Sequence, residues 1–121
     1  NQRVMRDVSA VETATTLAGQ ESAMPVALAP VGMAGMLGRR AEVQAKRAAD
    51  AAGVPFTLST VSICSLDEIA AVSDKPFWFQ LYTMNDADYV RRLIQRAKDA
   101  KCSALVMKVS SDSSAFFLKL A

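Results

Sequence analysis

Residues 76–82 read PFWFQLY, and this run of large apolar side chains decides how the chain around it folds. In a strand, side chains alternate between faces, so Trp78, Gln80 and Tyr82 share one face and the residues between them share the other. Because both faces carry bulky apolar groups, the run predicts a strand that is buried on both sides. Its two hydrogen-bonding side chains, Gln80 and Tyr82, lie together at the carboxyl end.

Three other apolar runs are also typical of buried strands. They are residues 26–30 (VALAP), 56–60 (FTLST) and 104–109 (ALVMKV). Stretches with helical character separate the runs, and strands that alternate with helices predict right-handed crossovers and a parallel sheet. The fold class is therefore α/β, either a doubly wound sheet or a barrel.

Three helices are expected between these strands. The first covers residues 38–53, where alanine and long charged side chains dominate and Gly53 supplies a stop. The second opens at SLDE, where Ser65 and Glu68 can form a capping box. The third covers residues 86–101 and starts at Asn85 or Asp86. Its buried stripe consists of Val90, Leu93, Ile94 and Ala97.

Polar groups follow three of the expected strands. The backbone-rich loop PVGMAG (residues 30–35) follows the first, Ser59 and Thr60 end the second, and Gln80 and Tyr82 end the third. Since ligands of parallel α/β folds bind at the carboxyl ends of the strands, this edge is the candidate site. The alternative is a core glutamine with satisfied hydrogen bonds and a tyrosine at the rim.

Composition narrows the class of protein. The chain has 121 residues, is 51% hydrophobic and carries a net charge of +2, which fits one globular domain. The sequence has no basic tract of the kind that binds nucleic acid. It also has no apolar run of the roughly 18 residues that would span a membrane. The opening NQRVMRD does not resemble a signal peptide, so a cytoplasmic location is expected. Cys64 and Cys102 are expected to be reduced thiols without a metal.

Four segments together resemble the FMN-dependent α-hydroxy-acid dehydrogenases and oxidases, and within that family the bacterial respiratory L-lactate dehydrogenases. The segments are MPVALAPVGMAGM, RRAEVQAKRAADAAGVPFTLSTVSIC, PFWFQLY and RAKDAKCSALV. The resemblance implies a (β/α)₈ TIM barrel with FMN at the carboxyl ends of its strands, of which this chain would supply about the first four. Residues 1–25 would be a lead-in, 26–109 half of the barrel, and 110–121 a divergent tail.

The resemblance also assigns roles to particular residues. It implies that the backbone of Pro30, Val31 and Gly32 lies beside the reactive edge of the flavin. It further implies that Ser59 and Gln80 hydrogen-bond the flavin. By the same resemblance Tyr82 faces the substrate near the flavin.

The chain departs from the family pattern at Lys108, where a threonine that contacts the flavin is expected. The tail SSDSSAFFLKLA then lacks the arginine region that should follow. Truncation or a frame slip explains this more simply than a purposeful variant, and it predicts no designed packing partner for residues 116–118. Deletion of residues 110–121 is then expected to leave the melting behaviour unchanged.

The reaction of the family needs a base, a cationic clamp for the carboxylate and a hydride acceptor. The resemblance implies a histidine, two arginines and FMN in these roles, but this chain has no histidine. Its arginines, among them Arg39, Arg40, Arg91 and Arg92, fall in helical segments and are expected to be solvated. The chain alone is therefore expected to be inactive and to bind FMN weakly.

The resemblance implies that the whole protein oxidises L-lactate to pyruvate, with hydride transfer to FMN and electrons to a quinone. It would be peripheral on the cytoplasmic face of the bacterial inner membrane. Glycolate or mandelate as substrate remains open. So does a non-catalytic half-barrel that associates with another chain or forms a homo-oligomer, because four parallel strands leave two open edges.

Overall fold

A parallel sheet forms the centre of the computed structural model, which describes residues 7, 9–82, 84–108 and 115–119. Its strands β3 (Thr57–Ser59), β4 (Phe77–Leu81) and β5 (Cys102–Lys108) are parallel and lie in that order. A fourth strand, β6 (Ala115–Lys119), pairs antiparallel with β5. The expected α/β class and the three later parallel strands are thus present.

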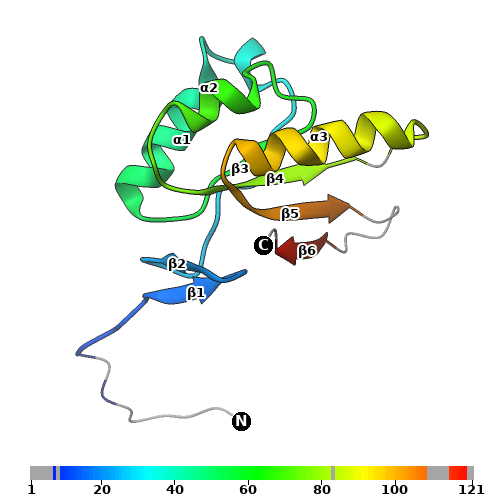
Figure 1. The fold of residues 1–121 in the computed structure, drawn as a ribbon. Helices are drawn as coiled ribbons and strands as arrows, with labels where there is room; N and C mark the ends of the chain where they lie inside the picture. Colours follow the sequence, from blue (N-terminus) through cyan, green and yellow to red (C-terminus); the bar gives the residue numbers. More distant parts are fainter. Residues whose placement is uncertain (1–6, 8, 83, 109–114, 120–121) are drawn as a thin grey trace.

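Helices cover one face of this sheet (Figure 1). They are α1 (Ala41–Ala52), α2 (Leu66–Ala70) and α3 (Ala87–Asp99), with a short 3₁₀ helix η1 (Ala34–Met36) before α1. The capping box predicted for Ser65 and Glu68 is present, and Asp86 caps α3 through the backbone N–H groups of Asp88 and Tyr89. The three predicted helices are confirmed. No helix in the described ranges has the length and apolar character to cross a bilayer.

The core has one part on each face of the sheet. On the helical side, the apolar side chains of β4 that alternate with Trp78 pack beneath the helices, with the stripe of α3 against them. On the opposite side, Trp78, Ala104 and Val106 form a second cluster with Leu17 and Ala27. All of β4 is buried, which confirms the prediction from PFWFQLY.

An antiparallel hairpin lies on the side of the sheet away from the helices (Figure 1). Its strands are β1 (Thr15–Leu17) and β2 (Gln20–Ser22). The two-residue turn between them has positive φ at Ala18 (48°) and Gly19 (81°), the conformation that suits a tight hairpin and that glycine tolerates best. Leu17 of the hairpin packs against the cluster that contains Trp78.

Two expectations need correction. The run at 26–30 is no full strand, because it makes a single parallel bridge between Leu28 and Phe56. The backbone at 115–119 does have a partner, since β6 occupies the edge of β5 that was expected to be open. The backbone of Lys108 ends β5 opposite Ala115, whereas its side chain and those of β6 lie outside what the structure describes.

Candidate functional site

Ser59 and Gln80 face each other across the paired ends of β3 and β4. Both are buried, with exposed fractions of 3% and 4%. The Ser59 hydroxyl accepts a hydrogen bond from the Val61 backbone N–H (3.2 Å) and lies 3.2 Å from Gln80 Oε1, to which it donates. The serine thus orients the glutamine amide, with its oxygen toward β3.

The other end of that amide is free to bind something else. Gln80 Nε2 is buried and has no hydrogen-bond partner among the described residues. A buried donor without a partner costs free energy of about 1–3 kcal/mol, so such a group is expected to meet an acceptor from a ligand or water. This is the feature of the site that best fits a bound planar cofactor with carbonyl and ring-nitrogen acceptors.

Thr60 joins the same two strand ends on the side of Tyr82. Its hydroxyl donates to the Gln80 carbonyl oxygen and accepts from the Tyr82 backbone N–H at 3.2 Å. Tyr82 lies at the rim with 41% of its surface exposed. The sequence marked Thr60 as a polar strand end only, and its bridging role depends on the register of β3 and β4.

The loop after the first β segment approaches Ser59 closely. A Cβ on Gly32 would lie 2.8 Å from Val61 Cγ2 and 4.0 Å from Ser59 Oγ, so a side chain at that position would displace Val61. The Met33 N–H donates to the Val61 carbonyl (2.9 Å), and this holds the loop in place. The backbone of Gly32, which carries no side chain, thus lies close to Ser59.

A mainly apolar cavity of about 330 Å³ adjoins this arrangement. Val31 and Ser59 both line it, together with Glu42 from α1. The structure therefore brings the loop and Ser59 together with Gln80, and Tyr82 lies exposed just after β4. The flavin and substrate roles of these residues stay predictions.

No arginine in the described part of the chain lines the cavity beside Ser59. Arg40 pairs with Glu68 at 3.1 Å, Arg91 pairs with Asp88, and all four arginines named above are exposed. Their expected place on the solvated surface is confirmed.

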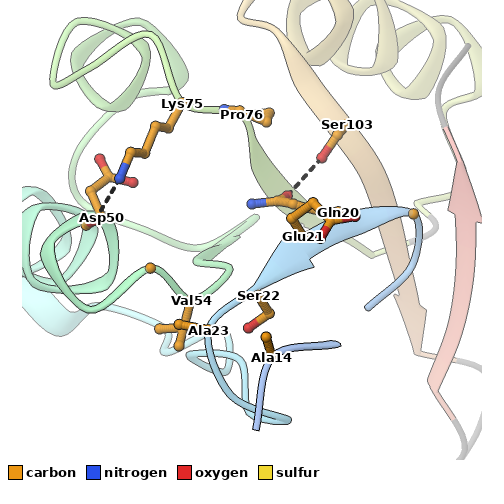
Figure 2. Close-up of a pocket in the computed structure, with 12 residues that line it drawn as sticks. Ala14, Gln20, Glu21, Ser22, Ala23, Asp50, Val54, Lys75, Pro76 and Ser103 are labelled. Atoms are coloured by element: carbon orange, nitrogen blue, oxygen red, sulfur yellow. Dashed lines mark hydrogen bonds between the residues drawn. The ribbon is translucent and has the colours of Figure 1, made fainter. Parts of the chain in front are cut away.

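A larger cavity of about 630 Å³ lies at the opposite, amino-terminal end of the strands, beside the hairpin (Figure 2). Its main polar side chains already have partners: Lys75 Nζ donates to the Asp50 carbonyl (2.7 Å) and the Ser103 hydroxyl donates to Gln20 (3.1 Å). Because these groups hydrogen-bond within the protein, the cavity offers a ligand fewer open hydrogen-bonding groups than the edge at Gln80 does.

The fold is α/β, and its candidate site lies at the carboxyl ends of parallel strands. Residues 1–115 match the family of FMN-dependent dehydrogenases, and the chain belongs to that family. It is 58% identical over 108 residues to an L-lactate dehydrogenase of Caulobacter sp. (strain K31) and 52% identical to one of Ectopseudomonas mendocina (strain ymp). Each alignment covers 89% of this chain and 28% of the relative.

Solved structures of mandelate oxidase share the fold. One has a TM-score of 0.79 at 43% identity and covers 87% of this chain and 31% of that enzyme. Another, which contains an FMN adduct, has a TM-score of 0.80 at 41% identity. The chain thus spans less than a third of the relatives that it matches.

Proposed function

We propose that the carboxyl-terminal edge of β3 and β4 is part of an FMN site. The observation that carries this proposal is the buried Nε2 of Gln80, which has no hydrogen-bond partner among the described residues. Ser59 aligns this amide, and the side-chain-free backbone of Gly32 lies near Ser59. These groups fit a flat ring system with hydrogen-bond acceptors. FMN, when bound, supplies the hydride acceptor for oxidation of a hydroxy acid.

We infer further that the whole protein is an L-lactate dehydrogenase that forms pyruvate. Identity supports lactate, because the L-lactate dehydrogenases match at 52–58% whereas the mandelate oxidases match at 41–43%. In this proposal Tyr82 faces the substrate, and the base and carboxylate clamp come from outside these 121 residues. A quinone acceptor, peripheral attachment to a membrane and a homo-oligomeric state complete the proposal.

The proposed architecture is a (β/α)₈ barrel to which residues 26–109 contribute the first half, with 1–25 as lead-in and 110–121 as tail. The parallel order β3-β4-β5, with the Leu28 bridge beside β3, supports it. Closure of such a barrel would place the Gln80 face inward, as a ligand site requires.

Titration of the chain with FMN tests the site. We expect weak binding, with FMN lost on desalting, because in the proposed barrel the loops that would hold the FMN phosphate belong to the second half. Gln80→Glu replaces the open donor by an acceptor and should weaken binding about tenfold, which corresponds to about 1.4 kcal/mol. Gln44→Glu, the same change at an exposed position of α1, is the control. Equal affinities for the two variants would refute the assignment of Gln80.

A further inference from the structure

Glu42 joins the two loops that flank the proposed flavin site. It lies in the first turn of α1 and is buried, with 3% of its surface exposed. Its Oε1 accepts hydrogen bonds from the backbone N–H of Gly35 (3.1 Å) and of Ile63 (3.0 Å). Gly35 belongs to the loop after the first β segment and Ile63 to the loop after β3, so one carboxylate oxygen fixes both.

Gly35 packs closely against Ile63 and Glu42. A Cβ on Gly35 would lie 3.0 Å from Ile63 Cβ and 3.3 Å from Glu42 Oε2. Because glycine has no side chain, the two loops can come into contact at Gly35. The bond from Met33 N–H to the Val61 carbonyl is a second link between the same loops.

The electrostatics favour a charged carboxylate at this position. Burial opposes ionisation of Glu42, but hydrogen bonds from the backbone N–H groups, those of Ile63 and Gly35 among them, outweigh it, and the pKa of Glu42 is lowered from its ordinary value. Hydrogen bonds to an ionised acceptor are stronger than neutral ones. At neutral pH the link is thus a pair of charge-assisted bonds.

We propose that Glu42 is a positioning residue of the flavin site, which holds the 31–37 loop against the 61–63 loop so that Gly32 stays beside Ser59. The Glu42 contacts at Gly35 and Ile63 lie about one turn of chain after residues 30–32 and Ser59, which carry proposed flavin contacts. This inference rests on the proposed FMN site.

Two measurements on the full chain test the role. Hydrogen exchange of the Gly35 and Ile63 amides reports the link itself. A titration with FMN, followed through the amide signals of Gly32 and Ser59, reports the site. We expect Glu42→Ala to speed exchange of both amides at least about tenfold and to weaken FMN binding about tenfold. Glu42→Gln keeps an acceptor oxygen and should limit each change to about threefold.

Gln44→Ala, on the exposed side of the same helix turn, is the matched control and should change neither readout. If Glu42→Ala does not fold, Glu42→Gln decides alone, with an expected change of about threefold in both readouts relative to the unmodified chain. Faster amide exchange with unchanged FMN affinity would overturn the positioning role and leave a merely structural one. Unchanged hydrogen exchange of the Gly35 and Ile63 amides in Glu42→Ala would show that Glu42 does not link the two loops. No FMN-induced shift in the unmodified chain, with Gly35 and Ile63 still protected, would instead refute the proposed flavin site and, with it, the positioning role.

Discussion

The Ser59 hydroxyl lies 3.2 Å from Gln80 Oε1, and this contact joins the carboxyl ends of β3 and β4. The two residues are direct partners in the strand register, so the contact follows from the way in which the sheet is assembled. Because the serine engages the amide oxygen, the amide nitrogen remains as the open donor. The orientation of one buried side chain is thus what makes this edge a candidate for cofactor binding.

The first prediction concerns activity. The isolated chain should not oxidise L-lactate, because it has no histidine and its arginines named above are exposed. Loss of a general base alone typically costs about two to four orders of magnitude in rate. Dye reduction with L-lactate and added FMN should not exceed the rate with free FMN. The L-lactate dehydrogenase of Caulobacter sp. (strain K31) is the positive control, and turnover by the chain above background would contradict the prediction.

A second prediction concerns Thr60. Thr60→Val leaves the Tyr82 N–H and the Gln80 carbonyl without their partner, and the free energy of unfolding should fall by about 1–3 kcal/mol. Urea unfolding measures this. Thr60→Ser keeps the hydroxyl and is the control. A valine variant as stable as the serine variant would show that the bridge contributes nothing.

The buried pair Lys46–Asp50 gives a third prediction. Lys46 is fully buried on α1, with Nζ 2.6 Å from Asp50 and 3.0 Å from the Ser73 hydroxyl. Asp50→Asn leaves a buried ammonium without its counter-charge, so the loss of stability should be about 3–5 kcal/mol. Asp88→Asn breaks the exposed pair with Arg91 and should cost less than about 1 kcal/mol. Similar losses for the two variants in thermal unfolding would disprove the burial argument.

A fourth prediction concerns the tail. From the sequence, deletion of residues 110–121 was expected to be neutral, but β6 pairs along β5. Deletion should therefore remove backbone hydrogen bonds and expose a sheet edge, with melting lowered by several degrees and stronger self-association. Circular dichroism and light scattering measure both effects. Removal of residues 120–121 alone is the control, and an unchanged melting temperature for the long deletion would restore the original expectation.

The fifth prediction concerns the two buried thiols. Burial raises the pKa of Cys102 to about 12, and burial together with hydrogen bonding and the negative charge of Glu42 raises the pKa of Cys64. At pH 8 only about one Cys102 in ten thousand would be thiolate, which is the reactive form. Iodoacetamide should label the native chain at least about a hundredfold more slowly than the urea-unfolded chain. Equal rates would contradict the buried placement.

The sequence by itself determined the local features. Alternation in PFWFQLY predicted β4 and the common face of Gln80 and Tyr82, since strand periodicity depends only on neighbouring residues. The caps at Ser65 and Asp86 and the stripe of α3 followed in the same way. Only the tertiary structure decided the partners that lie far apart in the chain. It reduced 26–30 to one bridge, paired β6 with β5, buried Lys46 against Ser73 and set Glu42 between two loops. Those contacts depend on register and packing between distant segments, which no local pattern encodes.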